Sequence, residues 1–371
     1  MKHQHFLPFF LVLAASYLGL HFYAARWLIK HFSLPSSPAA WLRAAFLMAA
    51  FFAPFTMYLK RQWHTPALEP LYTAGYAWMG VILLAAFIFA CSDLAGLVAR
   101  RTGATGDLRV AQAAITVFFL TLAWAFYCGL KAPDIKHITL AFKDLPPALE
   151  GYKIAQVSDM HIDSQWKLRR FSALIEKINS AAPDLVVITG DLIDPGITCL
   201  ENPAALTAKI QSRHGVFGSP GNHEYYYGLE RALACYKAFG ITPLVNEAAD
   251  LADLRLIGLG DIRTENASET DVKNLLLKYK TGKFTIILSH QPLYYPSMAE
   301  TGNYLVLSGH THKGQIFPFH ILTKLFYRHF YGTHRIKESV FHVTSGAGTW
   351  GPPMRWLAPA EIPLITLTRL P

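Results

Sequence analysis

Residues Tyr304 to His312 read Tyr-Leu-Val-Leu-Ser-Gly-His-Thr-His, and this stretch decides which fold the sequence indicates. An apolar run ends in two histidines, His310 and His312, that are separated by one residue. Because strand side chains alternate faces with a period of two, both imidazoles would point the same way as a pair of metal ligands. A second pair, Asp159 and His161, follows another apolar run. Two such pairs predict a metal site at the ends of strands.

Five short polar motifs each follow an apolar, strand-like run. Between residues 137 and 371, such runs alternate with helical segments, which predicts a layered α/β domain. Ligands of α/β folds bind beyond the carboxyl ends of the strands, so the five runs would bring their motifs to one place. The nitrogen and oxygen ligands suit divalent ions such as Mn, Fe or Zn. The motifs are Asp159-Met160-His161, Gly190-Asp191-Leu192-Ile193-Asp194, Gly221-Asn222-His223-Glu224, Ser289-His290 and Gly309-His310-Thr311-His312.

Over about residues 137 to 371, the sequence resembles the calcineurin-like metallophosphoesterases. The resemblance rests on five motifs in this order: D-x-H, G-D-x-x-D, G-N-H-E, H and G-H-x-H. The segment Gly346 to Arg355, GAGTWGPPMR, is similar to the membrane-anchored branch that includes the transmembrane protein with metallophosphoesterase domain. The resemblance implies an α/β/β/α metallophosphoesterase domain over residues 131–371, and an enzyme that hydrolyses phosphoric esters.

The resemblance also implies a role for each motif residue. Asp191 would bridge two divalent ions, while His223 would face the phosphate or the leaving group, so these two are the expected catalytic residues. Two ions about 3.5 to 4 Å apart can hold the attacking and leaving oxygens and activate a bridging hydroxide. One ion would be held by Asp159, His161 and His312, and the other by Asn222, His290 and His310. Manganese, iron and zinc all stay open.

Residues 1–130 are expected to form a transmembrane region of four helices. Four apolar segments, at about 6–29, 41–59, 71–99 and 110–130, each reach the ~20 residues that cross a bilayer. This region holds nine Lys or Arg and three acidic residues, so most of the net charge of +9 lies beside apolar segments. The balance favours a phospholipid surface over nucleic acid as a partner.

An even number of spans would place the C-terminal domain on the same side of a cell (inner) membrane as the N-terminus. Basic residues are almost evenly divided between the two sets of loops, so the side itself stays open. Asp93, the one acid inside a predicted span, is either a functional carboxylate or an interfacial partner of Arg100 or Arg101. The interfacial ion pair is the favoured reading.

Three further features leave alternatives open. Residues 317–331 read as a basic, aromatic amphipathic segment, which is either a membrane-facing lid or a helix packed on the core. Asp194 and Glu224 either orient ligands or are solvated loop acids, and Lys313 either meets substrate or is exposed. The leading function is hydrolysis of a phosphodiester or phosphomonoester, with a substrate that could be lipid-linked. A lipid-precursor pyrophosphatase of the UDP-linked acyl sugar type, and a non-catalytic membrane scaffold or sensor, are the alternatives.

Overall fold

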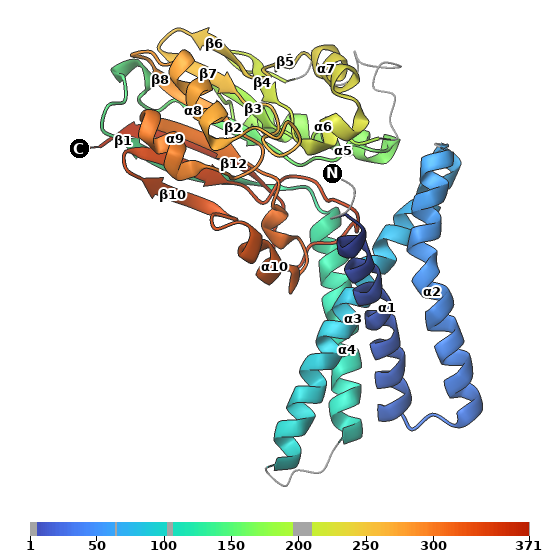
Figure 1. Cartoon of the computed structure of the whole chain (residues 1–371). Coiled ribbons are helices and arrows are strands. Elements are labelled where there is room, and N and C mark those ends of the chain that lie inside the picture. Colours follow the sequence, from blue (N-terminus) through green and yellow to red (C-terminus); the bar gives the residue numbers. More distant parts are fainter. Residues whose placement is uncertain (1–5, 64, 102–106, 196–209, 371) are drawn as a thin grey trace. The chain divides into compact units, whose positions relative to one another are not determined.

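The computed structural model describes residues 6–63, 65–101, 107–195 and 210–370, which form two compact units (Figure 1). The first unit holds residues up to Leu130 together with Gly351–Trp356. The second holds Lys131–Trp350 and the residues from Leu357 onward.

Four long helices make up most of the first unit. They are α1 (Phe6–His31), α2 (Ser36–Gln62), α3 (Glu69–Arg101) and α4 (Asp107–Leu130), with a short 3-10 helix at Pro66–Leu68. Among the described residues, three stretches are long and apolar enough to cross a membrane: Ser36–Gln62, Glu69–Arg101 and Leu108–Leu130. These three support the expected transmembrane region, while a crossing by the first predicted span, 6–29, stays a prediction.

The partners of Asp93 differ from those that the sequence indicated. Its carboxylate accepts a hydrogen bond from the Tyr23 hydroxyl at 2.8 Å and lies 2.8 Å from Nε2 of His31. Lys30 Nζ is 3.8 Å away. Because the Trp27 and Phe89 rings stack at 3.9 Å, the last turn of α1 runs alongside this part of α3. The expected pairing with Arg100 or Arg101 is therefore replaced by contacts with α1.

Two six-stranded sheets form the second unit. The first has the order β1 (Asp134–Phe142), β12 (Glu361–Arg369), β2 (Lys153–Val157), β3 (Leu185–Thr189), β4 (Val216–Ser219) and β5 (Thr242–Pro243). The second has the order β10 (Gly332–Ile336), β11 (Ser339–Val343), β9 (Tyr304–Ser308), β8 (Phe284–Leu288), β7 (Leu254–Gly258) and β6 (Glu247–Leu251).

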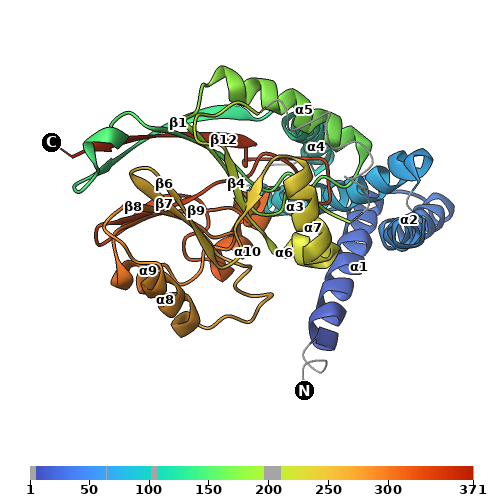
Figure 2. The same cartoon turned by 90° about the horizontal axis from the view of Figure 1, so that it is seen from above.

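Side chains alternate between the two faces of each strand, so the buried apolar residues form three core layers: one between the two sheets and one under the helices on each outer face. On β3, Val187 packs between the two sheets, whereas Val186 packs under the helices that cover the first sheet. On β9, Val306 likewise packs under the helices of the second sheet. The covering helices are α5 (Gln165–Ser180) and α7 (Leu229–Ala238) on the first sheet, and α8 (Glu269–Lys278) and α9 (Tyr295–Thr301) on the second (Figure 2). The predicted α/β/β/α layering is confirmed.

The strands that precede the motifs are parallel neighbours. In the first sheet β2, β3 and β4 run side by side, with Val157 opposite Ile188 and Thr189 opposite Ser219. In the second sheet β8 pairs with β9, and Leu288 lies opposite Leu307. The amide of Gln156 donates to the carbonyl of Ser308 at 3.0 Å, so the two sheets meet where these strands end. Five motifs from two sheets therefore converge at one edge of the domain.

Some predicted elements differ from the structure. The residue pattern of 204–213 predicts a helix; most of this stretch lies outside the described residues, and its described part, 210–213, is not helical. The edge strands β6 and β10 were not predicted, because each lies at the end of its sheet and carries a mixture of apolar, polar and charged residues without a continuous apolar run. Neither edge strand contributes a motif residue.

Candidate metal centre

The loops after the strands hold several motif residues in an unusual backbone conformation. Asp159, His161, Asp191, His310 and His312 all have positive φ, between 47° and 69°. Residues other than glycine seldom adopt this left-handed region, and such residues cluster at functional sites. The backbone therefore turns sharply after each strand and aims these side chains back toward a shared space.

One group of side chains comes from β2 and β9. Nε2 of His161 lies 3.0 Å from Nε2 of His312, and Nε2 of His312 lies 3.4 Å from Oδ1 of Asp159. All three residues are almost completely buried. Their ligand atoms lie within 4.8 Å of one another, so one metal ion could bind all three.

A second group comes from β3, β8 and the loop after β9. Nε2 of His290 lies 3.0 Å from Oδ2 of Asp191 and 3.2 Å from Nδ1 of His310. The amide of Asn222, the first residue of α6 (Asn222–Tyr227), offers a further oxygen. This Oδ1 is buried and has no hydrogen-bond partner within the described structure. A buried acceptor without a partner is costly, and a metal ion would satisfy it.

Asp191 lies between the two groups. Its Oδ2 is 3.0 Å from Nε2 of His290 in the second group and 3.8 Å from Nε2 of His161 in the first. A carboxylate in this position can reach ions on both sides. The structure thus brings together Asp159, His161, Asp191, His290, His310 and His312, and the orphan oxygen of Asn222 is a further candidate ligand.

The electrostatics of the buried cluster favour added positive charge. Burial by itself lowers the pKa of His290, but the charge and hydrogen bond of Asp191 outweigh it and raise that pKa to about 10. Burial and the charge of His290 together lower the pKa of His310 to about 3. The positive charge of protonated His290 therefore balances the negative charge of the buried carboxylates, as a bound cation would do. The donor set and its charge fit divalent metal ions.

Asp194 orients two of the histidines. Its Oδ1 accepts from Nδ1 of His161 at 3.0 Å and lies 2.6 Å from Nδ1 of His223. These contacts leave Nε2 of His161 to face the first group, as carboxylates do for metal-bound histidines. Burial lowers the pKa of His223, but the hydrogen bond and charge of Asp194 outweigh it and raise that pKa to about 9. Asp194 is therefore an orienting residue and not a solvated loop acid.

Glu224 joins two of the loops. Its carboxylate is completely buried and accepts from the backbone N–H groups of Asp191, Leu192 and Ile193 at 2.8 to 3.1 Å. The N–H of Gly221 donates to it at 2.7 Å. The loop that carries Asp191 and the loop that carries Asn222 are thus held to one carboxylate. Glu224 acts as a structural brace for the ligand loops.

A chain of hydrogen bonds fixes the tautomer of His310. The Asp261 carboxylate can only accept, so the Gln291 amide faces it with Nε2, at 2.9 and 3.1 Å. The Gln291 oxygen then accepts from the Tyr327 hydroxyl at 3.3 Å. Because the hydroxyl proton of Tyr327 is donated to Gln291, the Tyr327 oxygen accepts a hydrogen bond from Nε2–H of His310 at 2.8 Å. The lone pair of His310 is therefore on Nδ1, which faces His290. No pattern in the sequence singled out Asp261, Gln291 or Tyr327.

The ammonium of Lys313 lies 4.5 Å from the centre of the Tyr331 ring and so faces this aromatic group.

Two glycines leave room for the candidate ligands. A Cβ on Gly309 would collide with the side chains of Ser158 and Asp159, and one on Gly221 would collide with Asp191. The glycines of the G-N-H-E and G-H-x-H motifs are thus required by close packing against side chains of the candidate ligands.

Comparisons with known proteins agree with this arrangement. The family model described as calcineurin-like phosphoesterase matches residues 152–314. An uncharacterized metallophosphoesterase from Helicobacter pylori is 36% identical over 289 residues, which cover 76% of each chain. The transmembrane protein with metallophosphoesterase domain from Danio rerio is 28% identical over 308 residues, covering 77% of this chain and 70% of the relative. The chain therefore belongs to the calcineurin-like phosphoesterase family, and it is a phosphoric ester hydrolase.

Proposed function

We propose that this protein is a membrane-anchored phosphoesterase that uses two divalent metal ions to hydrolyse a phosphodiester or a phosphomonoester. The observation that carries the proposal is the position of Asp191 between two groups of buried ligands, 3.0 Å from His290 and 3.8 Å from His161. The proposed metal ligands are Asp159, His161 and His312 for one ion, Asn222, His290 and His310 for the other, and Asp191 for both.

When bound, two such ions would activate a water molecule and neutralise charge on the phosphate. The protein's own residues supply the remaining chemistry. His223 follows the proposed ligand Asn222, and its Nδ1 is engaged by Asp194, so Nε2 is the nitrogen that can meet substrate. The Asp194 carboxylate favours the protonated ring. His223 is thus placed to donate a hydrogen bond, or a proton, to an oxygen of the substrate.

The test is hydrolysis of an aryl phosphodiester by the full-length protein, together with its metal content. Asp191→Ala should lose both bound metal and turnover. His223→Ala should keep its metal and lose most of its turnover. His137→Ala, on the exposed side of β1, is the matched control and should change neither. A wild-type protein that folds but neither binds metal nor hydrolyses the ester would favour the membrane scaffold or sensor instead.

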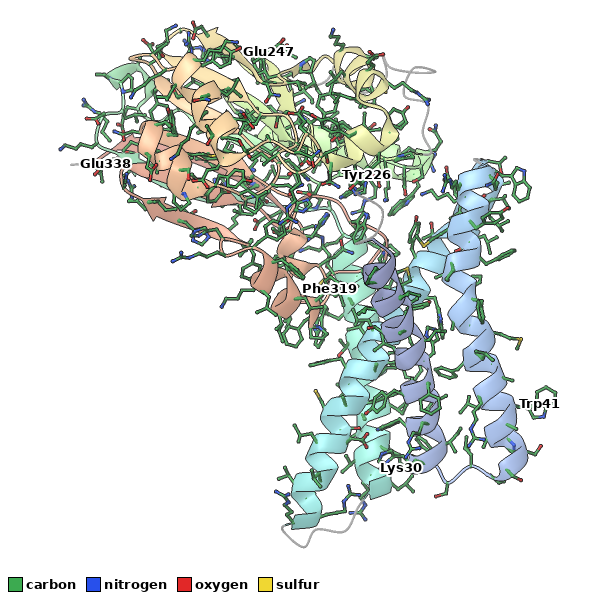
Figure 3. All side chains as sticks on the ribbon, viewed as in Figure 1. Lys30, Trp41, Tyr226, Glu247, Phe319 and Glu338 are labelled. Atoms are coloured by element: carbon green, nitrogen blue, oxygen red, sulfur yellow. The ribbon has the colours of Figure 1, made fainter. Side chains whose placement is uncertain are left out.

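A lipid-linked phosphodiester or pyrophosphate is a second candidate substrate, with the UDP-linked acyl sugars as one such class. Two exposed aromatic side chains flank His223 and favour a substrate with an apolar part. The Tyr226 ring centre lies 5.2 Å from that of His223, and the Trp350 ring centre lies 6.2 Å from it. Both rings are more than half exposed, and Tyr226 projects from α6 (Figure 3). Trp350→Ser should then reduce kcat/KM on a lipid-linked ester more than on a small soluble diester; equal losses would exclude this class.

We also propose that the protein lies in the cell (inner) membrane, with the catalytic domain and the N-terminus on the same side. Three helices are long and apolar enough to cross a membrane, and a crossing by α1 would make four spans. An even number of spans returns the chain to the side on which it began. Reporter tags at the two ends of the chain should be accessible to a protease from the same side of the membrane. Accessibility from opposite sides would mean an odd number of spans.

A further inference from the structure

Helix α10 (Phe319–Phe326) presents an unusually apolar surface. It follows the G-H-x-H loop by only a few residues, and none of its eight residues is buried. Leu325 is 76% exposed and Phe326 is 70% exposed. The interpretation of 317–331 as a helix packed on the core is therefore wrong for α10, because its apolar side chains face away from the sheets. Figure 3 shows Phe319 on this helix. The other exposed apolar residues of α10 are Phe319, Ile321 and Leu322.

The surface of α10 is two-sided. With 3.6 residues per turn, the five apolar residues fall on one side of the helix, while His320, Thr323 and Lys324 fall on the other. His320 Nε2–H donates to the carbonyl of Leu357 at 3.1 Å, which ties a further apolar residue, 58% exposed, to the helix. α10 and Leu357 together, called the α10 surface below, have the pattern of a helix that lies in a membrane interface.

The charged residues along the chain on either side of α10 are all basic. From His312 to Lys337 the sequence contains no Asp or Glu. Lys324 and Arg328 are both exposed, one within the helix and one just after it. Basic residues beside an apolar helix are attracted to anionic phospholipid headgroups. A second protein would need a complementary acidic and apolar surface, whereas an anionic bilayer offers both features at once.

The chain itself holds this domain at a membrane. Helix α4, whose stretch Leu108–Leu130 satisfies the criteria for a span, ends only a few residues before β1 begins at Asp134. The residues just before Leu357 return to the helical unit, where the N–H of Arg355 donates to the carbonyl of Ala125 in α4 at 2.9 Å. The domain is thus attached to the membrane helices at two places in the sequence, and the second adjoins the α10 surface.

From these observations we propose that the α10 surface inserts into the headgroup region of the anionic bilayer that the protein's own helices cross. Its apolar side lies toward the acyl chains, and Lys324 and Arg328 meet lipid phosphates. Because Tyr327, at the end of α10, contacts His310, insertion would hold the metal centre close to the membrane surface. This inference concerns membrane contact and does not depend on hydrolysis.

The test places a fluorescent probe on single cysteines of the full-length protein in nanodiscs. The four cysteines of the sequence, Cys91, Cys128, Cys199 and Cys235, are replaced by serine, and an environment-sensitive label is attached at Leu325→Cys. Leu277→Cys, on an exposed position of α8, is the matched control, and Val117→Cys in α4 reports direct lipid contact. Lipids that carry a spin label quench only nearby probes, so a label near the headgroup reports on position 325, and a label in the middle of the acyl chain reports on position 117 near the centre of its span. Lipid quenching is therefore measured independently of enzyme activity.

We expect strong quenching at positions 325 and 117 and several-fold weaker quenching at position 277. Equal quenching at 325 and 277, or none at 325, would overturn the proposal; the latter result would mean that α10 packs on protein. Replacing phosphatidylglycerol by phosphatidylcholine, or Lys324→Glu with Arg328→Glu, should reduce quenching at 325 and leave that at 117 unchanged. If neither the lipid replacement nor the two substitutions changes the quenching at 325, the anionic bilayer is not the partner.

Discussion

The hydroxyl oxygen of Tyr327 lies 2.8 Å from Nε2 of His310, and this contact joins a residue at the end of α10 to a proposed metal ligand. Tyr327 also donates to Gln291, which in turn is held by the buried Asp261 carboxylate. The contact therefore fixes which nitrogen of His310 carries a proton. Any substitution that removes the Tyr327 hydroxyl should therefore change the affinity for the metal.

Tyr327→Phe should weaken metal binding by roughly 10- to 100-fold, as for other partners of metal-bound histidines. The ring that fills the space remains, but His310 is free to move its proton to Nδ1 and turn away. Metal titration of the full-length protein measures the affinity, and turnover should recover at saturating metal. Tyr304→Phe, which removes a hydroxyl that lies 3.2 Å from Thr301, is the control. Wild-type metal affinity in Tyr327→Phe would refute the positioning role.

Asp194→Asn should lower turnover by roughly 10- to 100-fold while the protein stays folded. The change keeps the shape of the side chain but removes the charge that both His161 and His223 meet. The measurement is the kcat for an aryl phosphodiester at saturating metal. Asp163→Asn is the matched control, because Asp163 is a neighbouring acid that pairs with Lys167 at 3.2 Å. Equal effects of the two substitutions would show that the loss is not specific to Asp194.

Glu224→Ala should lower the free energy of unfolding by at least roughly 3 kcal/mol, because each buried N–H left without its acceptor costs about 1 to 3 kcal/mol. Four backbone N–H groups donate to this carboxylate. Thermal or denaturant unfolding of the domain in detergent measures the change. Glu230→Ala, an exposed acid on α7, should shift stability by less than about 0.5 kcal/mol. A Glu224→Ala protein as stable as Glu230→Ala would mean that water replaces the carboxylate.

Removal of metal by a chelator should lower the Tm of the wild-type protein. The carboxylates of Asp159 and Asp191 are buried together, so an ion that binds only the folded state stabilises it by mass action. Added Mn²⁺, Fe²⁺ or Zn²⁺ should restore the Tm to an extent that ranks their affinities. Asp191→Asn should show a much smaller response to chelator. A wild-type Tm that is independent of chelator and of added metal would argue against metal in this site.

Much of the fold could be predicted from the sequence because its signals are local. The apolar runs before Asp159, Asp191 and His290 each become a strand whose side chains alternate between two cores, and that alternation follows from backbone geometry alone. The polar motifs after these runs mark the ends of the strands. The edge strands were missed because their pairing, and not their own sequence, makes them strands.

Other features were decided only by tertiary structure. The orphan oxygen of Asn222, the Asp93 contacts with α1, and the chain from Asp261 to Tyr327 depend on residues that are far apart in sequence. Nothing in the local pattern of Tyr327 marks it as the partner of His310. The amphipathic pattern of α10 was visible in the sequence, but the same pattern serves a core helix or a membrane surface.

The sequence by itself thus determined the layered domain and the types of candidate ligand at each strand end, because the backbone's period of two and the chemistry of His, Asp and Asn act locally. The tertiary structure decided which ligands meet and which face of α10 stays exposed. Side chains such as His161 and His312 come within 3.0 Å only because two sheets, distant in sequence, pack against each other. Their packing is a long-range property that no single stretch of residues encodes.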